Sequence, residues 1–361
     1  MELRKTIKLT PNGLTKTKEA MLGQEYDAWL ACLRYGDSAD VPLYSATKQQ
    51  ATILRHRLKK RFSMTRNYPM VLRNDVIKLE KARNAEWSRW WFRVPVKAIR
   101  GGLWCPVTMA PAHEELLADA SIKIREAKLI RKRNHWSVHV VLQKDVQAPD
   151  IDAYPNILAI DMGERNPATA VLMAPGSSVR PVFYGRKVRG IRRHHAWLRT
   201  APQEKRAFRT VKKVKDREAR RVAALLHNAA KDIVAVAKET SATIVIGDFT
   251  GGHRDTGRGR RFNRMVNSMP FHSLMSMIEY KAMWQDVPVV YVGEAYTSQE
   301  CHVCHAMGRR RTRSSFECSA CGWRGNADMN GALNIGQRWE RLQQLVGWNG
   351  ADSTQPMNPA V

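Results

Sequence analysis

The chain has 361 residues, of which 60 are Lys or Arg and 33 are Asp or Glu, so its formal net charge at pH 7 is +27. With 43% hydrophobic and 26% charged residues it has a globular composition, which excludes a disordered or fibrous chain. A surface this basic repels itself unless a polyanion screens it, and nucleic acid is the usual polyanion.

Neither a membrane span nor an export signal is visible in the sequence. No apolar run reaches the roughly 18 residues that cross a bilayer. The first six residues, Met1 to Thr6, lack the apolar segment of a signal peptide. We therefore expect a soluble, cytoplasmic protein that makes no use of a membrane.

The first 150 residues predict a mainly β domain that is interrupted by helices. Apolar residues alternate along residues 2–10, as in a strand, and the same period of two returns over residues 88–145. The intervening residues, from 11 to 85, have a helical pattern with a break at residues 36–42. We expect one β domain, formed by residues 1–10 and 86–150, with a helical insertion at 11–85.

After a linker at residues 146–156, the pattern becomes that of an α/β domain over residues 151–298 and 324–346. The expected strands are residues 157–160, 169–173, 180–184, 243–246 and 287–292. The expected helical segments are the basic stretch 186–240, residues 268–284 and residues 327–345. The tail, residues 347–361, has little to pack, so we expect it to be disordered.

Four of the six cysteines have the spacing of a metal site. Cys301, Cys304, Cys318 and Cys321 follow the pattern C-x2-C-x13-C-x2-C, in which each pair puts two thiolates on one tight turn. About 25 residues cannot bury enough apolar surface to fold alone, so a metal would stabilise this segment. We expect one structural zinc ion bound by a ribbon at residues 299–323, with a redox or disulfide role as the alternative.

Three acids stand where α/β proteins bind ligands. Asp161 ends the first buried strand, Glu294 ends the last strand, and Asp328 begins the last helix. Oxygen ligands gathered at such a place suit Mg²⁺ or Mn²⁺, and two such ions about 3.5–4 Å apart promote phosphodiester hydrolysis. Taken singly, Asp161 is also explained as a turn residue and Asp328 as a charge at a helix N-terminus. Glu164, in the turn after Asp161, is a weaker candidate.

Five motifs in fixed order resemble the TnpB family, compact transposon-encoded nucleases that are related to type V CRISPR effectors. The motifs span residues 159–163, 244–249, 296–304, 318–323 and 326–335. The resemblance implies an RNase H-like RuvC nuclease domain with a zinc-ribbon insertion. It also implies a preceding β-barrel wedge domain that carries a helical recognition insertion.

The same resemblance implies the partners and the reaction. The expected partners are a guide RNA made from the transposon end and a double-stranded target DNA, which is cut beside a short transposon-adjacent motif. The expected cofactors are two Mg²⁺ or Mn²⁺ ions and one Zn²⁺ ion. Such a protein is expected to be encoded by a bacterium or phage, to be monomeric or dimeric on RNA, and to associate with the nucleoid when it acts.

At one position the chain departs from the family. The family's middle glutamate ends the second buried strand, where this chain has Gly247, which cannot bind a metal. Asp248 is adjacent, but strand side chains alternate, so we expect it to point to the other face. Neighbouring strands lie about 4.8 Å apart, so Glu294 can reach the same place from the next strand. The predicted catalytic metal ligands are Asp161, Glu294 and Asp328.

Basic residues gather in several segments that suit nucleic-acid phosphates. Between Arg186 and Arg221 there are 15 Lys or Arg against three acids, a density that suits an RNA–DNA duplex, with a solvated helix face as the alternative. Tyr44, Arg55, Arg66 and Tyr68 are candidates for reading the adjacent motif. The predicted nucleic-acid contacts are Arg55, Lys59, Arg189, Arg192, Arg193, Lys212, Lys213, Arg217, Arg254, Arg258, Arg260, Arg261, Arg309, Arg310 and Arg311.

Two other functions stay open at the level of the sequence. Because of Gly247, the protein could be a nuclease-inactive, RNA-guided DNA-binding repressor. An ATP-dependent kinase of the actin–hexokinase type has a phosphate loop similar to residues 160–163. The kinase explains neither the cysteines nor the charge.

Overall fold

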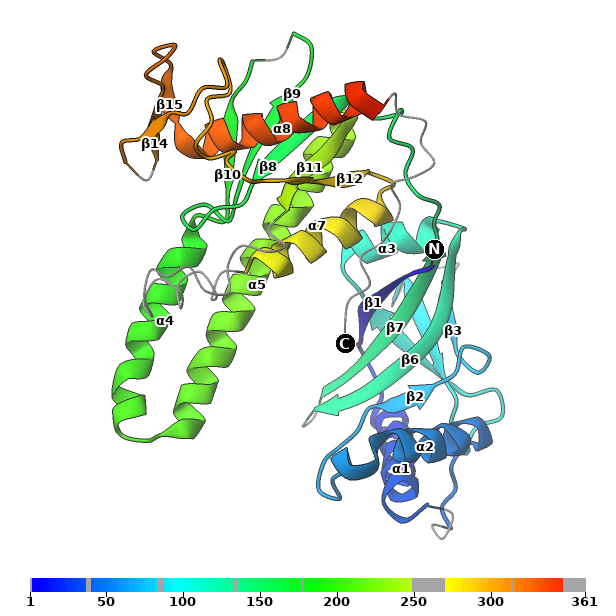
Figure 1. Ribbon diagram of the computed structural model, residues 1–361. Helices are drawn as coiled ribbons and strands as arrows, with labels where there is room; N and C mark the ends of the chain where they lie inside the picture. The colour runs from blue at the N-terminus through cyan, green and yellow to red at the C-terminus, as the bar shows by residue number, and fades with distance from the viewer. Residues whose placement is uncertain are drawn as a thin grey trace. The chain divides into compact units, whose positions relative to one another are not determined.

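The computed structural model describes residues 2–36, 40–82, 88–132, 135–176, 178–248, 270–312 and 314–346, with the chain traced in Figure 1. The chain divides into two units, residues 1–146 and 147–361. Among the described helices, none is long and apolar enough to cross a membrane.

The first unit is built on a seven-stranded antiparallel sheet with the order β2-β6-β7-β1-β5-β4-β3. Its strands are β1 (Glu2–Pro11), β2 (Met70–Leu72), β3 (Lys78–Lys81), β4 (Trp90–Val94), β5 (Leu103–Thr108), β6 (Ile122–Lys132) and β7 (His135–Asp145). Strand β1 pairs with β7 up to Leu9 and with β5 from Thr10 onward, so it joins the two halves of the sheet. The sheet is strongly curved (Figure 1), but the described strand order begins at β2 and ends at β3 instead of closing into a barrel.

The helical insertion is shorter than the predicted 11–85. It consists of α1 (Lys16–Tyr35), α2 (Ser45–Leu58) and one 3₁₀ turn (Lys59–Arg61). The prediction of helix beyond residue 61 is wrong, because β2 and β3 lie there and pair with β6 and β4. A strand of three or four residues is too short for a period of two to stand out in a sequence. A further helix, α3 (Pro111–Ala118), was also not predicted.

The second unit has a mixed five-stranded sheet with the order β10-β9-β8-β11-β12. The strands are β8 (Asn156–Asp161), β9 (Ala168–Met173), β10 (Pro181–Tyr184), β11 (Ala242–Asp248) and β12 (Val289–Gly293). Strands β8, β11 and β12 are parallel, while β9 and β10 continue antiparallel from β8. The parallel strands are the three continuous apolar runs of the sequence, because helices cover both of their faces.

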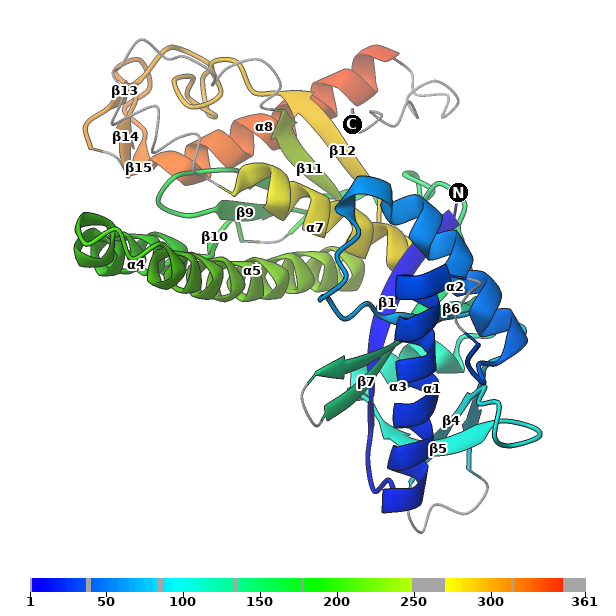
Figure 2. The ribbon, with the colours of Figure 1, turned by 90° about the horizontal axis from the view of Figure 1, so that it is seen from below.

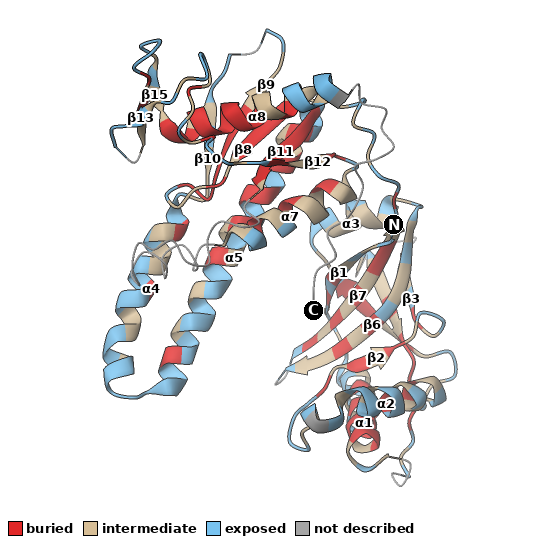
Figure 3. Cartoon of the chain, viewed as in Figure 1, coloured by how far each residue is buried: buried red, intermediate tan, exposed pale blue. Residues whose placement is uncertain are grey.

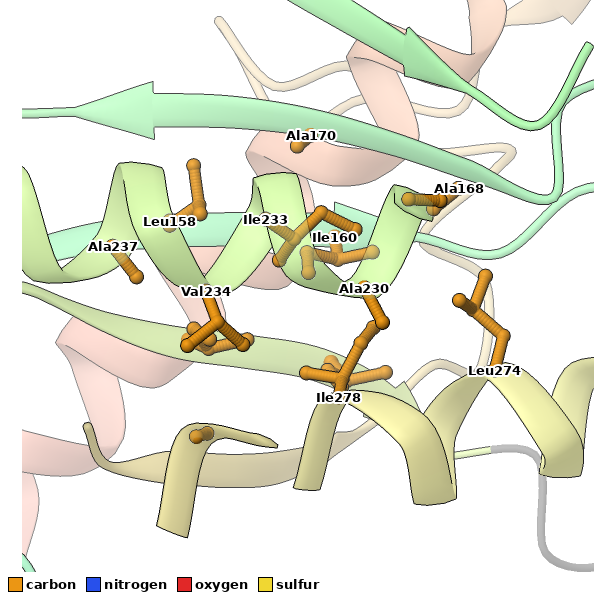
Figure 4. Close-up of a cluster of buried hydrophobic side chains, with 14 of the residues drawn as sticks. Leu158, Ile160, Ala168, Ala170, Ala230, Ile233, Val234, Ala237, Leu274 and Ile278 are labelled. Carbon is orange, nitrogen blue, oxygen red and sulfur yellow. The ribbon is translucent and has the colours of Figure 1, made fainter. Parts of the chain in front are cut away.

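One face of this sheet packs on α5 (Phe208–Glu239) and α7 (Phe271–Trp284). Figure 4 shows Ile160 of β8 beside Ile233 of α5, with Ile278 of α7 near Ala230 of α5 in the same cluster. The other face packs on α8 (Ala327–Val346), whose Ile335 joins a core with Ala159 and Val245. Residues of odd number on β8 and β11 therefore face α8, and those of even number face α5.

The basic stretch at residues 186–240 is an antiparallel pair of helices, α4 (Lys187–Glu204) and α5, which lie side by side in Figure 1 and overlap when seen from below in Figure 2. The half of this helix pair that lies away from the five-stranded sheet is mostly exposed, whereas the part of α5 that covers the sheet is mostly buried (Figure 3). The ribbon between β12 and α8 contains β13 (Arg309–Arg310), β14 (Ser315–Glu317) and β15 (Arg324–Asn326). The predicted disordered tail, residues 347–361, lies outside the described residues.

Candidate metal centres and nucleic-acid surface

Asp161 lies at the end of β8 on the face that α8 covers. It follows Ala159 by two residues, and alternate residues of a strand share a face. A Cβ added at Gly331 of α8 would lie 3.2 Å from Cγ of Asp161 and 3.3 Å from each of its carboxylate oxygens. The carboxyl group therefore lies directly against the helix, at a residue without a side chain.

Glu294 fills the space above Gly247. In the parallel pairing of β11 and β12, Gly247 is opposite Val292, and Glu294 follows two residues later on the same face. A Cβ added at Gly247 would lie 3.1 Å from Oε2 and 3.2 Å from Cβ of Glu294. The side chain of Glu294 thus occupies the place into which a longer residue at 247 would extend.

Asp328 reaches the site from the first turn of α8 and is 8% exposed. The side-chain oxygen of Asn326 accepts hydrogen bonds from the backbone N–H groups of Asp328 (2.9 Å) and Met329 (3.0 Å), which caps the helix at this point. Asn166, in the turn between β8 and β9, donates Nδ2–H to Oδ2 of Asp328 at 2.9 Å. The turn after Asp161 therefore orients the carboxylate on α8.

The three carboxylates interact electrostatically. Burial, and next the charge of Asp328, raise the pKa of Asp161 to about 7, while Arg310 acts in the opposite direction. Burial, followed by the charges of Asp161 and Asp248, raises the pKa of Glu294 to about 8. Like charges held together in a protein favour protonation unless a cation balances them. The donor set therefore fits hard divalent cations, which bind carboxylate oxygens.

The carboxylates are spaced more widely than the ligands of a single compact ion site. Among the described residues, the four cysteines alone form a group of three or more Cys, His, Asp or Glu whose ligand atoms all lie within 4.8 Å of one another. Two ions about 3.5–4 Å apart require ligands that are spread over a wider span than one ion does. The spacing is compatible with two ions, and the assignment of these residues as ligands stays a prediction.

Glu164, the weaker candidate, faces a different partner. Its Oε1 lies 3.5 Å from Nε of Arg189, so the two side chains form an ion pair. This pair also occupies one of the arginines that were predicted to contact nucleic acid. Asp248 pairs with Gly293 in the sheet and, by alternation from Gly247, belongs to the opposite face from Glu294.

The four cysteines lie close enough together to hold one metal ion. The Sγ atoms of Cys301 and Cys321 are 3.7 Å apart, and those of Cys304 and Cys318 are 3.5 Å apart. Four thiolates about 2.3 Å from one zinc ion lie about 3.8 Å from each other, so the set fits zinc. Hydrogen bonds from the backbone N–H groups of Cys321 and Ala320 help to lower the pKa of the Cys318 thiol to about 7.

The predicted nucleic-acid residues differ in how accessible they are. Arg192 is half-buried and its pKa is lowered, chiefly by burial, and Arg311 pairs with Glu317 through Nε at 2.6 Å. The loop residues Arg254, Arg258, Arg260 and Arg261 lie outside the described residues. The exposed members are Arg55, Lys59, Arg193, Lys212, Lys213, Arg217, Arg309, Arg310 and Arg311.

Tyr68 is not available to read a DNA motif. It is 5% exposed, and its hydroxyl accepts a hydrogen bond from the backbone N–H of Ser63 at 2.8 Å. Its carbonyl oxygen accepts hydrogen bonds from Tyr26 (2.8 Å) and Trp29 (3.3 Å). The prediction for this residue is wrong, because its ring is buried and stacks on Phe62 with 5.4 Å between the ring centroids. Arg66 is exposed, with its guanidinium 5.6 Å from the ring centroid of Tyr68.

Two residues near the acids were not singled out from the sequence. Asn166 contacts Asp328 across 162 positions, and Arg338 donates hydrogen bonds to the carbonyl oxygens of Gly293 and Ala295, the second at 3.1 Å. For Arg338 the sequence holds one signal, which is its spacing of four residues from Asn334 and eight from Asn330, so that the three side chains lie on one side of the helix.

Comparisons with known proteins find similarity to proteins of the Cas12f and TnpB-like groups. A family model described as "Cas12f1-like, TNB domain" matches residues 271–335. The CRISPR-associated endodeoxyribonuclease Cas12f1 of Sulfoacidibacillus thermotolerans is 27% identical over 222 residues, which are 56% of this chain and 50% of that protein. A TnpB-like protein of Aquifex aeolicus is 25% identical over 266 residues, which are 67% of this chain and 85% of that protein.

A solved structure shows the same fold. The crystal structure of C2c1 from Alicyclobacillus acidoterrestris with single-guide RNA and extended non-target DNA aligns with a TM-score of 0.53 at 8% identity. The alignment covers 82% of this chain and 59% of that one. The chain thus shares its fold with C2c1, and it spans about half the length of the curated Cas12f1 relative that it matches.

Proposed function

Because the chain belongs to the TnpB family, we propose that it is an RNA-guided DNA endonuclease that hydrolyses phosphodiester bonds of a target DNA with two divalent metal ions. The second unit is the RuvC-like nuclease domain of this proposal. The bound ions, Mg²⁺ or Mn²⁺, would activate the attacking water and stabilise the leaving oxygen.

A single observation carries the proposal. The carboxylate of Glu294 fills the space above Gly247 and lies on the same face of the sheet as Asp161. In a chain that had lost its middle acid and its activity together, nothing would favour a half-buried glutamate there, because withdrawing an unpaired carboxylate from water is unfavourable. The raised pKa of Glu294 reflects that cost in the absence of a cation.

Different residues of the chain have different roles in the proposed site. Asp161, Glu294 and Asp328 would hold the ions, and Asn166 fixes the orientation of the Asp328 carboxylate through its 2.9 Å hydrogen bond. The cysteines would hold one structural zinc ion, which leaves no open position for catalysis at that metal. Exposed Arg309 and Arg310, on the ribbon, carry positive charge that suits the target backbone.

The partners follow from charge and from family. The guide RNA would derive from the transposon end, and the target would be double-stranded DNA beside a short transposon-adjacent motif. Lys212, Lys213 and Arg217 lie exposed on α5, where they suit the backbone of a guide–target duplex. We place the protein in the cytoplasm of a bacterium or phage-infected cell, as a monomer or dimer on its RNA.

Gly247 favours a second candidate, a guided DNA-binding repressor that does not cut. Both candidates bind the same RNA and DNA, so cleavage alone separates them. The experiment is to purify the protein with its co-purifying RNA, sequence that RNA, and supply a plasmid that carries the matching target with a randomised flank.

For the nuclease we expect Mg²⁺-dependent linearisation of the plasmid, which Asp161→Ala and Glu294→Ala abolish while RNA binding is retained. Asp248→Asn is the matched control, because it removes a neighbouring carboxylate on the opposite face. Target binding without cleavage by the unaltered protein, at any Mg²⁺ or Mn²⁺ concentration, would establish the repressor.

A further inference from the structure

A stripe of polar side chains runs along α8 next to the segment that connects Glu294 to the first cysteines. Its members are four, seven and eight residues beyond the first, a spacing that puts them on one side of a helix. Each donates hydrogen bonds to backbone carbonyl oxygens of residues 293–302. The stripe consists of Asn330, Asn334, Gln337 and Arg338.

The first three members hold the part of the segment that approaches the ribbon. Nδ2–H groups of Asn330 and Asn334 both reach the carbonyl oxygen of Glu300, each at 2.7 Å, and Asn334 also donates to the carbonyl oxygen of Thr297 at 2.8 Å. Gln337 donates to the carbonyl oxygen of His302 at 3.0 Å. These side-chain amides thus supply hydrogen bonds to backbone carbonyl groups that a neighbouring strand would supply in a sheet.

Arg338 holds the part of the segment that carries the acid. Its guanidinium donates to the carbonyl oxygens of Gly293 and Ala295, the residues on either side of Glu294. The carbonyl oxygen of Glu294 itself accepts from the backbone N–H (3.1 Å) and the hydroxyl (2.9 Å) of Thr297. Three consecutive carbonyl groups are therefore fixed around this one side chain.

Glu294 needs such support more than an acid within a strand does. The pairing of β12 with β11 ends at Gly293, opposite Asp248, so Glu294 lies one residue beyond the last paired position. Gly293 precedes it and adds backbone freedom. An acid at 247, by contrast, would stand inside β11, which pairs with β12 along its whole end.

We propose that Arg338 is a positioning residue that holds the backbone of Glu294 so that its carboxylate stays above Gly247 and can bind a divalent cation. Arg338 touches neither the ion nor the DNA in this role. The inference rests on the proposed function, because it requires Glu294 to be a metal ligand.

Mn²⁺ binding to the zinc-loaded, RNA-free full chain, followed by electron paramagnetic resonance, tests the inference without relying on cleavage. Loss of a residue that orients a metal ligand weakens metal binding by about 10–100-fold, and we expect this for Arg338→Leu. Arg338→Lys should give a smaller loss, because one ammonium group cannot bridge two carbonyl oxygens as a planar guanidinium does. Arg341→Leu is the matched control, since Arg341 contacts His305 on the same helix face and should leave Mn²⁺ binding unchanged.

The decisive measurement repeats Arg338→Leu in a Glu294→Ala background. If Arg338 acts through Glu294, the second substitution adds less than about a twofold change, as expected for two residues that act as one unit. An equal 10–100-fold loss in both backgrounds would overturn the inference and indicate general damage to the site. Unchanged Mn²⁺ binding in Glu294→Ala alone would instead overturn the ligand assignment on which the inference rests.

Discussion

Exchanging two residues tests whether Gly247 and Glu294 share one functional place. The double variant Gly247→Glu/Glu294→Gly keeps the composition of the chain and returns the carboxylate to β11. It also removes the Cβ of Glu294, which would lie 3.2 Å from the new Cβ at 247. The remaining close contact is with Cδ1 of Ile335 at 3.1 Å, which has to move by a few tenths of an ångström.

The magnitudes follow from this geometry. Glu294→Gly removes a proposed metal ligand and should lower the cleavage rate by more than about 100-fold, since loss of an orienting partner alone costs about 10–100-fold. Gly247→Glu alone places two carboxylates in one space, and such overpacking destabilises a core by about 1–3 kcal/mol. In the exchange, the new side chain starts from a Cβ that would lie 3.1 Å from the present position of Oε2 of Glu294, so its carboxylate can reach the same space. Its position has to be accurate, because a 1 Å error costs about 100-fold. We expect the exchange to restore at least about tenfold of the activity that Glu294→Gly loses.

The assay is plasmid cleavage by the protein with its guide RNA, with thermal unfolding and zinc content measured for every variant. Glu294→Gly should be inactive, Gly247→Glu should unfold at a lower temperature than the unaltered protein, and the exchange should cut at the same phosphates as the unaltered protein. An exchange variant that is folded and zinc-loaded yet as inactive as Glu294→Gly would refute the idea of a shared place.

Three further outcomes follow from the site and the helices. Cys318→Ser should lower bound zinc from about one equivalent to a small fraction by elemental analysis, and retention of a full equivalent would contradict a four-thiolate site. Without divalent ions, Asp161 and Glu294 keep their protons in the folded chain up to a higher pH than in the unfolded chain, because their pKa values are raised to about 7 and about 8. The stability that this contributes is present below about pH 4 and is lost as pH rises through about 7 and 8. The melting temperature of Asp161→Asn/Glu294→Gln should therefore fall less over that pH range than that of the unaltered protein, and an identical fall would contradict the raised pKa values. Lys212→Gln/Lys213→Gln should reduce the slope of log affinity for RNA against log salt by about 1.4–1.8, measured by filter binding, whereas an unchanged slope would place both lysines outside the interface.

The sequence predicted the parts of the fold whose signal is local. Residues of β8, β11 and β12 form continuous apolar runs because helices cover both faces of the sheet, and the cysteine spacing depends only on tight turns. The placement of Glu294 beside Gly247 was also predictable, because it required only the spacing of strands and the alternation of side chains.

What escaped prediction depends on contacts between distant segments. Strand β2 has three residues and acquires its identity from pairing with β6, about 57 residues later. Tyr68 was assigned to the surface although its backbone carbonyl oxygen accepts hydrogen bonds from Tyr26 and Trp29 of α1, which no local pattern shows. Arg338 resembles any other basic helix residue until its two carbonyl partners are seen. Such contacts are set by packing in three dimensions.

The glycine at 247 also bears on how related chains are sorted into cutters and non-cutters. A survey that scores one alignment column would place this chain among the inert relatives, since that column holds no acid. The space above Gly247 is nevertheless filled by Glu294, which follows the neighbouring strand and whose Oε2 would lie 3.1 Å from a Cβ at position 247. A classification that asks whether any acid from a neighbouring strand end fills this space would group the chain differently from one that reads a single position of the alignment.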